Sequence, residues 1–516
     1  MGAPAGNGVG ENVRTVADLV RRAARRDPGH LALISGADRV TWGELDERAD
    51  RAAGALLELG LRPGDRVALQ LANTPDFPVL YAGALRAGLV AVPTNTGYTG
   101  PELAHIVTDA EARALVTSSV HALEAVDRLR AEAPALEHVV AAAPSGPDGT
   151  LPLPALLANA TAGPDHDAAP EDLAVLMYTS GTSGRPRGAM LTHRALLANL
   201  EQCASIRPPV VSPGDVLLLA IPMFHVYGLN PAFGMLARAG ATGVMVERFD
   251  PAGSLELMAR HRVTNVPGVP EMYRRWADEP GLAAGFASVR LALSGAAPLP
   301  AETLRRFAAS GITVWEGYGL TEAAPVVTST LVGREAKPGS VGRPLHGVEL
   351  LLRTEVDPED GGGTEDPGEI LVRGPNLFSG YWPSGADGPG EDGWWATGDV
   401  AYVDDDGDLH LVDRRKELII VNGFNVYPAE VEAVLAAHPQ VAEVAVLGRT
   451  EPSGDEAVLA YVVTREPVTE AALLDHAARS LARFKLPSAV TFVQELPHSA
   501  TGKISKAALR ESRPTA

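Results

Sequence analysis

The strongest constraint on the fold is an alternation of short apolar runs with amphipathic helical segments. It extends over residues 14–117 and resumes over 172–322, with strand-like runs such as "RVALQL" and "LVAVP" between helical stretches. One helical stretch opens with Thr41 and Glu44 at the spacing of a capping box. Short buried strands between amphipathic helices are typical of a parallel, doubly wound sheet. We therefore predict an α/β fold with doubly wound sheets in a large N-terminal domain.

The pattern changes between residues 341 and 411. Short strand-like pieces there are separated by acidic loops rich in glycine and proline, such as "DPEDGGGTEDPG". This composition predicts a β-rich subdomain with exposed hairpins. The run "DDDGD" at 404–408 has Tyr402 where a calcium loop needs its first aspartate, so we interpret it as a solvated hairpin turn.

The last hundred residues predict a small α+β domain. A helix starts at Pro428, strands follow in "VAEVAVLG" and "AVLAYVV", and a second helix is expected over 470–484. The segment is long enough for a domain of its own. The expected organisation is an N-terminal domain at 1–413 that includes a flexible tail at 1–12 and the β-rich subdomain at 341–411, then a hinge at 414–416 and a mobile C-terminal lid domain at 417–516.

Composition excludes some classes of partner. The net charge is −20 and no basic block occurs, so the attraction to phosphate backbones that supports nucleic-acid binding is missing. No apolar run approaches the length of a membrane span. The single cysteine, Cys203, permits no internal disulfide and fits a reducing compartment, so we expect a cytoplasmic protein. Arginine greatly outnumbers lysine, which makes each remaining lysine a residue of interest.

A loop rich in hydroxyls and glycines follows the apolar run "LAVLM". It reads "YTSGTSGRPRG" over 178–188, and small residues of this kind let backbone amides and hydroxyls converge on an anion. It is not the common P-loop, because Ser183 stands where that motif has glycine and no Lys-Ser/Thr pair follows. Taken alone, a flexible loop without a ligand is an equally good interpretation.

Seven motifs together carry a resemblance to a known family. They are "YTSGTSGRPRG", "PMFHVYG", "SGAAPL", "GYGLTE", "TGD", "VDRRKELIIVNGFNVYPAEVE" and "TGKI", in this order. The chain resembles the acyl-adenylate-forming (AMP-binding) superfamily over essentially its whole length. That superfamily includes acyl-CoA synthetases, coumarate-type CoA ligases, beetle luciferases and the adenylation domains of peptide synthetases.

The resemblance implies that the first motif wraps the β- and γ-phosphates of ATP. The family usually has threonine where this chain has Ser183 and lysine where it has Arg187. Serine keeps the hydroxyl and arginine keeps the charge, so phosphate contact should survive. The implied phosphate-binding residues are Thr179, Ser180, Gly181, Thr182, Ser183, Gly184, Arg187 and Gly188.

The motif "GYGLTE" resembles the adenine and metal segment of the family. By resemblance, Tyr318 between Gly317 and Gly319 stacks on the base, Thr321 meets the α-phosphate, and Glu322 holds Mg²⁺. An ordinary strand end with a glycine turn is the alternative for this motif alone.

Other segments are implied to complete the nucleotide site. Gly295, Ala296 and Ala297 would pass beneath the adenine, where larger side chains would collide. Asp399 is implied to accept the ribose hydroxyls and Arg414 to donate to the ribose or a phosphate. An aspartate next to a glycine is more often a turn former, so only the set of motifs supports this role.

Four further residues are implied to act in the reaction. His225 has two interpretations: a satisfied core histidine, or the family's residue beside the reacting carboxylate that gates the thiol. Lys503 resembles the adenylation lysine, and a flexible compact charge suits a group that must arrive and leave. Lys416 falls at the family's hinge position. The alternative interpretation is a surface lysine without a specific role. Gly423 would let a pantetheine arm pass along the backbone.

The resemblance implies an AMP-forming acid–thiol ligase that uses ATP, Mg²⁺ and CoA. The segment "GLNPAFGMLARAG" has no acid to pair with an α-ammonium group, which disfavours an amino acid, and Arg238 is the only nearby partner for a dicarboxylate. An apolar lining favours a fatty or aryl acid. Two alternatives remain at this point: transfer to the pantetheine of a carrier protein, and a non-catalytic nucleotide- or acyl-binding protein.

Overall fold

The computed structural model describes ten stretches of the chain. These are residues 13–98, 100–179, 186–354, 367–414, 419–421, 424–426, 428–450, 456–481, 485–498 and 504–511. The chain divides into two compact units, described separately below. The first unit is Met1–Pro338, Pro344–Glu349 and Arg373–Gly393, and the second is Gly339–Arg343, Leu350–Val372 and Trp394–Ala516.

The first unit contains a seven-stranded sheet in the order β7-β6-β5-β3-β4-β8-β9. Its pairs are parallel except the antiparallel β8–β9 hairpin. The strands are β3 (Arg66–Gln70), β4 (Val90–Pro93), β5 (Ala112–Thr117), β6 (His138–Ala141), β7 (Leu151–Pro152), β8 (Leu173–Thr179) and β9 (Arg187–Thr192). The connecting helices are α2 (Trp42–Glu58), α3 (Asp76–Arg86), α4 (Gly100–Asp109), α5 (Val120–Glu124), α6 (Val126–Glu132) and α7 (Leu153–Asn159). At the start of α2 the Thr41 hydroxyl accepts from Glu44 N and Glu44 accepts from Thr41 N, which confirms the predicted capping box.

A second, larger sheet in the same unit runs in the order β15-β14-β13-β12-β10-β11-β1-β2, and the short β16 (Arg343–Pro344) lies at the junction of the units. Its central strands are parallel, whereas β14–β15 and β1–β2 are antiparallel. The strands are β1 (Leu31–Ser35), β2 (Asp38–Thr41), β10 (Val216–Leu219), β11 (Thr242–Met245), β12 (Asn265–Gly268), β13 (Leu291–Ser294), β14 (Val314–Gly319) and β15 (Val326–Ser329). The α/β prediction with parallel sheets is confirmed.

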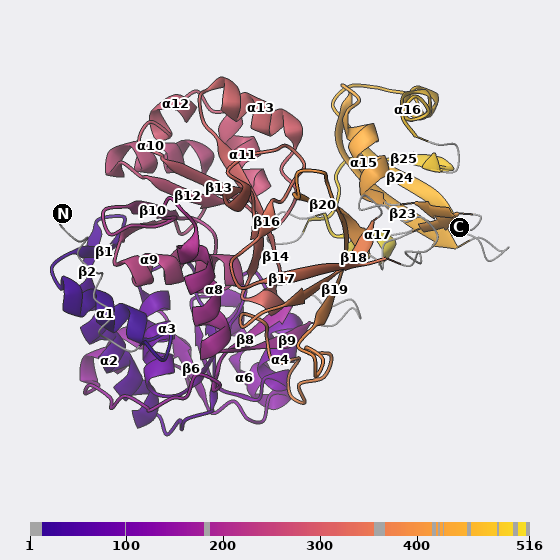
Figure 1. Ribbon diagram of the computed structural model, residues 1–516. Helices are drawn as coiled ribbons and strands as arrows, with labels where there is room; N and C mark the ends of the chain where they lie inside the picture. Colours follow the sequence, from indigo (N-terminus) through magenta and orange to yellow (C-terminus); the bar gives the residue numbers. More distant parts are fainter. Residues whose placement is uncertain are drawn as a thin grey trace, which may run out of the picture. The chain divides into compact units, whose positions relative to one another are not determined.

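The helices of the larger sheet include a group beside β12 and β13 (Figure 1). That group is α10 (Pro251–His261), α11 (Pro270–Ala277), α12 (Leu282–Gly285) and α13 (Ala301–Ala309). The others are α1 (Asp18–Arg26), α8 (His193–Ser205), the π-helix η1 (Gly228–Gly234), α9 (Met235–Ala239), the 3-10 turn η2 (Thr321–Ala323) and α14 (Thr330–Gly333). None of the helices in the described ranges is long and apolar enough to cross a membrane.

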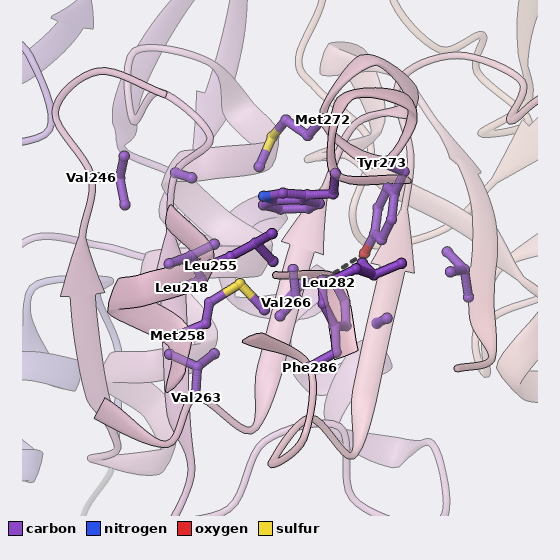
Figure 2. Close-up of a cluster of buried hydrophobic side chains, with 14 of the residues drawn as sticks. Leu218, Val246, Leu255, Met258, Val263, Val266, Met272, Tyr273, Leu282 and Phe286 are labelled. Atoms are coloured by element: carbon purple, nitrogen blue, oxygen red, sulfur yellow. Dashed lines mark hydrogen bonds between the residues drawn. The ribbon is translucent and has the colours of Figure 1, made fainter. Parts of the chain in front are cut away.

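An aromatic core fills the space between these helices and the sheet (Figure 2). Tyr273, Trp276 and Phe307 are fully buried and Phe286 nearly so. Their rings meet edge to face at centroid distances of 5.3–5.6 Å. The Tyr273 hydroxyl lies between β12 and β13, 2.9 Å from the carbonyl oxygen of Val266 and 3.0 Å from that of Leu293. The core therefore holds both strands by apolar packing and by one satisfied polar group.

The second unit begins with a four-stranded sheet, as the β-rich interval predicted. The strands are β17 (Glu349–Arg353), β18 (Gly368–Arg373), β19 (Trp395–Val403) and β20 (Leu409–Arg414), with antiparallel β18–β19 and β19–β20 pairs. In the β19–β20 turn, Asp404 Oδ1 accepts from the backbone of Asp406 at 3.1 Å and of Asp408 at 2.9 Å, and Gly407 has φ +85°. The aspartate run is thus a hairpin turn capped by its own side chain.

The rest of the second unit is the small α+β region. It contains the pair β21 (Ile419–Val421) and β22 (Phe424–Val426), the sheet β23 (Val441–Thr450), β24 (Glu456–Thr464) and β25 (Ala489–Phe492), and the helices α15 (Pro428–Ala436), α16 (Glu470–Ala477) and α17 (Lys506–Glu511). The helix expected over 470–484 ends earlier, at Ala477, where the amides of Ser480 and Leu481 both donate to Ala477 O in a closing turn; residues 482–484 lie outside the described residues.

The grouping of the two units does not follow a single boundary at 414–416. Strand β20 lies beside α15, so the β-rich strands cluster with the C-terminal region. Arg414 is the last residue of β20. Residues 415 and 416, like the expected tail at 1–12, lie outside the described residues. The hinge and the mobility of the last domain stay predictions.

Candidate active site

The parallel strands β10, β12, β13 and β14 place the predicted site residues at one edge. In a parallel sheet all carboxyl ends meet at the same edge, which is where ligands bind in open α/β folds. His225 follows β10, Gly295 to Ala297 follow β13, and the "GYG" residues end β14. Topology alone therefore brings together three of the motifs from positions far apart in the sequence.

The loop after β13 is tightly placed. A Cβ at Gly295 would lie 3.3 Å from Tyr227 Cε1, and Gly295 N donates to Gly268 O at 3.2 Å. Ala296 has φ +74°, a left-handed conformation that costs a non-glycine residue free energy. Tyr227 thus leaves little room for a side chain at Gly295. The contact of the small residues of this loop with a base stays a prediction.

Sequence reasoning missed Glu316, which supports this loop from the neighbouring strand. Glu316 on β14 is the register partner of Ser294 on β13, and both are buried. The Glu316 carboxylate accepts from Leu299 N at 3.1 Å, and burial raises the Glu316 pKa to about 7. Among the described residues, Ser294 Oγ is buried without a hydrogen-bond partner. The one signal available in the sequence was an acid inside the strand "VWEGYG".

The glycines of "GYGLTE" have a structural cause. A Cβ at Gly317 would lie 2.8 Å from Thr328 O, and one at Gly319 would lie 2.3 Å from Pro325 O. The antiparallel β14–β15 pair therefore excludes side chains at both positions. Tyr318 between them is buried, and Thr321 opens the 3-10 turn η2. Roles of these residues toward a nucleotide stay predictions.

Glu322 sits in η2 and is only 8% exposed. Its Oε1 accepts a hydrogen bond of 2.6 Å from the Tyr381 hydroxyl, and its backbone carbonyl accepts from Phe378 N at 2.8 Å. The described residues contain no group of three His, Cys, Asp or Glu side chains that could hold a metal ion. Mg²⁺ commonly binds through one or two carboxylates together with substrate phosphates and water, so the single Glu322 carboxylate fits that ion.

Arg187 opens β9 and also reaches Tyr381. Its guanidinium carbon lies 3.8 Å from the centroid of the Tyr381 ring, and its Nη2 pairs with Asp387 at 2.7 Å. Thr179, the last residue of β8, is the register partner of Arg187, and a Cβ at Gly188 would lie 3.2 Å from the Tyr178 ring. Ser180, Gly181, Thr182, Ser183 and Gly184 lie outside the described residues.

Two residues were considered in the sequence analysis as possible contacts of the reacting acid. His225 is half-buried and its Nδ1 accepts from Tyr227 N at 3.3 Å, which places the proton of a neutral ring on Nε2. Arg238 forms a two-pronged pair with Glu201, both contacts being 2.7 Å. The one arginine that sequence reasoning left for a second substrate carboxylate is therefore engaged by a carboxylate of the protein itself.

The second unit carries the remaining predicted residues. Asp399 on β19 is the register partner of Arg414 on β20, and its backbone N–H donates to Thr397 Oγ1 at 3.1 Å, beside Gly398 with φ +76°. The register of β19 and β20 thus sets the backbones of the two residues opposite each other; their contact with a ribose stays a prediction. Lys416, Gly423 and Lys503 lie outside the described residues.

The fold, with motif residues gathered at the carboxyl ends of its parallel strands, fits the class of nucleotide-dependent acid-activating enzymes, and comparison with known proteins gives the family. Residues 20–382 match the family described as AMP-binding enzyme, and residues 430–503 match the AMP-binding enzyme C-terminal domain. The chain belongs to the AMP-binding enzyme family and is an AMP-forming acid–thiol ligase.

Individual relatives match over nearly the whole chain. The long-chain-fatty-acid–CoA ligase of Escherichia coli O157:H7 is 34% identical over 539 residues, which covers 97% of this chain and 95% of the relative. The feruloyl-CoA synthase of an Amycolatopsis species is 36% identical over 497 residues, covering 95% and 97%. The ATP-bound crystal structure of MatB from Rhodopseudomonas palustris superimposes with a TM-score of 0.87 at 37% identity, covering 96% and 98%.

Proposed function

We propose that this enzyme activates a fatty or aryl carboxylic acid as its acyl-AMP and transfers the acyl group to the thiol of CoA. The observation that carries the proposal is the set of loops at the carboxyl edge. His225, the Gly295 loop and Glu322 all follow parallel strands of the larger sheet at their carboxyl ends, and the segments around them are mainly apolar, which supports a shared acid site. Relatives named as fatty-acid and feruloyl ligases support the acid classes.

The acid class follows from charge. Residues 220–230, 266–272, 292–300 and 316–330, which form or flank these loops, contain no lysine or arginine. A second carboxylate or another anion would lack a cationic partner there, and an unpaired buried charge is costly. Arg238 does not supply one, because Glu201 binds it. An acid whose only charge is the reacting carboxylate is therefore favoured over a dicarboxylate.

For ATP we propose the residues implied by the motifs. Arg187 and the loop 180–184 would bind the β- and γ-phosphates, Thr321 the α-phosphate and Glu322 the Mg²⁺ that ATP brings. Tyr318 would contact the adenine, and Asp399 with Arg414 would contact the ribose. Magnesium would neutralise phosphate charge as pyrophosphate leaves. The ATP-bound structure of the similar MatB supports the nucleotide.

The reaction would proceed in two steps. A carboxylate oxygen attacks the α-phosphorus, a C–O–P link forms, and the bond to the β-phosphate oxygen breaks. The C-terminal domain would turn about a hinge at Lys416 and bring Lys503 to the site. There Lys503 would stabilise the developing negative charge. A thiol sulfur then attacks the acyl carbon past His225 and Gly423, the C–S bond forms, and AMP leaves while the thiol proton goes to solvent.

One alternative is transfer to the pantetheine of a carrier protein, which shares its reactive arm with CoA. The other is a nucleotide- or acyl-binding protein without catalysis. The presence of Lys503, Glu322 and Asp399 disfavours the second, because a degenerate member would have lost such residues.

The test is pyrophosphate release with a panel of acids. Octanoate, palmitate, cinnamate, acetate, malonate and an amino acid are compared with ATP and Mg²⁺, with and without CoA. We expect the fatty or aryl acids to give the largest kcat/KM and CoA to be converted to a thioester. A best substrate that is an amino acid or a dicarboxylate would contradict the pocket argument. Pyrophosphate release without any CoA thioester would point to a carrier protein, and no release with any acid to the non-catalytic alternative.

A pair of lysine variants serves as the control in this assay. Lys503→Ala should slow pyrophosphate release by at least ~10²-fold, the effect of removing one preorganised charge-stabilising donor. Lys485→Ala is the matched change, because Lys485 pairs with Glu430 at 2.7 Å and has no proposed role in the reaction. Equal effects of the two variants would remove Lys503 from the mechanism.

A further inference from the structure

We propose that Tyr381 is a positioning residue that holds the magnesium carboxylate of Glu322 and the phosphate-binding Arg187 in a fixed relation. This inference rests on the proposed function of that site. Tyr381 belongs to none of the motifs that carry the family resemblance. Its role is inferred from the contacts of a segment that returns to the site about sixty residues after Glu322.

The segment that carries Tyr381 is fixed on two sides. Along β9, Ser379 N donates to Met190 O at 2.9 Å and Trp382 N donates to Gly188 O at 2.8 Å. On the other side, Phe378 N donates to Glu322 O at 2.8 Å. Residues 378–382 therefore tie the strand of the phosphate loop to the turn that carries Glu322.

Side chains on this segment leave the Tyr381 ring little freedom. Phe378 is 2% exposed and meets the Tyr381 ring edge to face at 5.0 Å. The Trp382 indole N–H donates to Asp109 O at 2.9 Å and anchors the far end of the segment. Because the backbone and the ring are both held, the hydroxyl and the ring face keep a fixed orientation relative to β9 and η2.

The two ends of Tyr381 act on different groups. Its hydroxyl donates to Glu322 Oε1 at 2.6 Å, which occupies one carboxylate oxygen and fixes the rotation of the carboxylate plane. The other oxygen, Oε2, would then be the one to bind a cation. Its ring face carries the Arg187 guanidinium at 3.8 Å. One phenol ring thus sets the distance between a metal ligand and a phosphate ligand.

Asp387 is the present ion-pair partner of Arg187, and the triphosphate of ATP would replace it there. Its side chain is 69% exposed and that of Arg187 36%, and ion pairs this exposed contribute little to stability. A triphosphate carries more charge than one carboxylate and can take the outward-facing donors of Arg187, while the ring stays stacked beneath it.

The experiment measures binding of a non-hydrolysable ATP analogue by calorimetry, with Mg²⁺ and with EDTA. Tyr381→Phe keeps the ring and removes only the hydroxyl. We expect this variant to lose about tenfold or more in affinity with Mg²⁺, the scale of a hydrogen bond to a charged group, and to match the wild type in EDTA. Tyr273→Phe is the matched control, because it removes a 2.9 Å bond from a tyrosine hydroxyl to the carbonyl oxygen of Val266 in the aromatic core. It should behave as wild type in both conditions.

Three outcomes would overturn the inference. They are unchanged affinity of Tyr381→Phe in Mg²⁺, an equal loss in Mg²⁺ and EDTA as a purely structural defect would give, or the same loss in Tyr273→Phe. Thermal unfolding of each variant confirms that it is folded. If Tyr381→Phe does not fold, Glu322→Gln takes its place, because the glutamine keeps an oxygen for the Tyr381 hydroxyl. This variant must bind the ATP analogue no more tightly with Mg²⁺ than with EDTA, while its affinity in EDTA matches that of the wild type. Because the readout is binding, it is independent of the acid panel: inactivity toward every acid would reject the proposed function and leave this measurement valid.

Discussion

Tyr273 and Tyr381 make the same kind of hydrogen bond in two different regions of the first unit. In the aromatic core, the Tyr273 hydroxyl is bound to backbone carbonyls of β12 and β13, and the ring is fully buried (Figure 2). At the carboxyl edge, the Tyr381 hydroxyl is bound to the Glu322 carboxylate, and the ring carries Arg187. A bond to the backbone inside a core satisfies a buried polar group. A bond to a carboxylate at the strand edge leaves charge in place for a ligand.

The difference shows where stability and activity separate in this fold. The core side chains contact one another and the sheet, so their removal should lower the free energy of unfolding. The edge side chains contact charged groups, such as Glu322 and Arg187, that are proposed to bind a ligand as well. Removing an edge side chain should therefore change ligand binding before it changes stability. Each prediction below would break or sharpen this division.

The largest effect is expected in the core. Trp276 is fully buried, packs edge to face on Tyr273 and Phe286, and donates from Nε1 to Ser254 Oγ at 2.8 Å. Trp276→Ala should lower the free energy of unfolding by about 3–5 kcal/mol, from lost burial and the cavity left behind. Denaturant unfolding measures it. The KM values for ATP and for the acid should stay at their wild-type values in the folded variant. If they changed as well, the core would affect ligand binding at the carboxyl edge, and the division would fail.

Glu316 lies between the two regions and should show a pH effect. Burial raises its pKa to about 7 from 4.5, so the folded protein holds a proton that the unfolded chain releases. The resulting stability is fully present below pH 4.5 and is lost as pH rises through 7. Glu316→Gln is neutral throughout and keeps an oxygen for Leu299 N. Its stability relative to wild type should therefore rise between pH 4.5 and 7, by up to about 3 kcal/mol.

The check is a pH series of unfolding midpoints for wild type and Glu316→Gln. A difference between them that stays constant from pH 4.5 to 8 would show that the Glu316 carboxyl titrates alike in the folded and unfolded chain. Glu302→Gln, the same change on the exposed side of α13, serves as the control for a surface glutamate.

A smaller effect is expected from Asp399 in the second unit. Asp399→Ala removes the proposed acceptor of the ribose hydroxyls and should raise the KM for ATP by the equivalent of about 1–3 kcal/mol. Asp405→Ala, in the exposed β19–β20 turn, should leave this KM unchanged. Steady-state pyrophosphate release with varied ATP measures both. An unaltered KM in Asp399→Ala would remove the residue from the nucleotide site.

The sequence was sufficient to predict the alternating α/β fold, because burial on both faces of parallel strands leaves short apolar runs. It also predicted the Thr41 capping box and the hairpin turn at 404–408, since both depend on residues a few positions apart. The helix at 470–484 was predicted too long, because it ends at Ala477; its last three expected residues lie outside the described residues.

The candidate site was less predictable where its contacts are long-range. Glu316 and Tyr381 were missed, because their partners Leu299 and Glu322 come from other segments and no local pattern marks them. The glycines of "GYG" were assigned to a ligand, whereas the position of β15 also requires them. Residues whose role depends on register can be predicted only after the register is known.

The central claim, that the edge serves the ligand and the core serves the fold, is tested most directly by a paired measurement on Tyr273→Phe and Tyr381→Phe. Each variant is assayed for its free energy of unfolding and for kcat/KM with ATP. Tyr273→Phe should lose about 1–3 kcal/mol of stability, because two buried carbonyls lose a donor, and should keep wild-type kinetics. Tyr381→Phe should lose more kcat/KM than its change in stability accounts for, because the hydroxyl that it removes is bonded to the Glu322 carboxylate. If both variants lost stability and activity in the same proportion, the division between edge and core would be wrong.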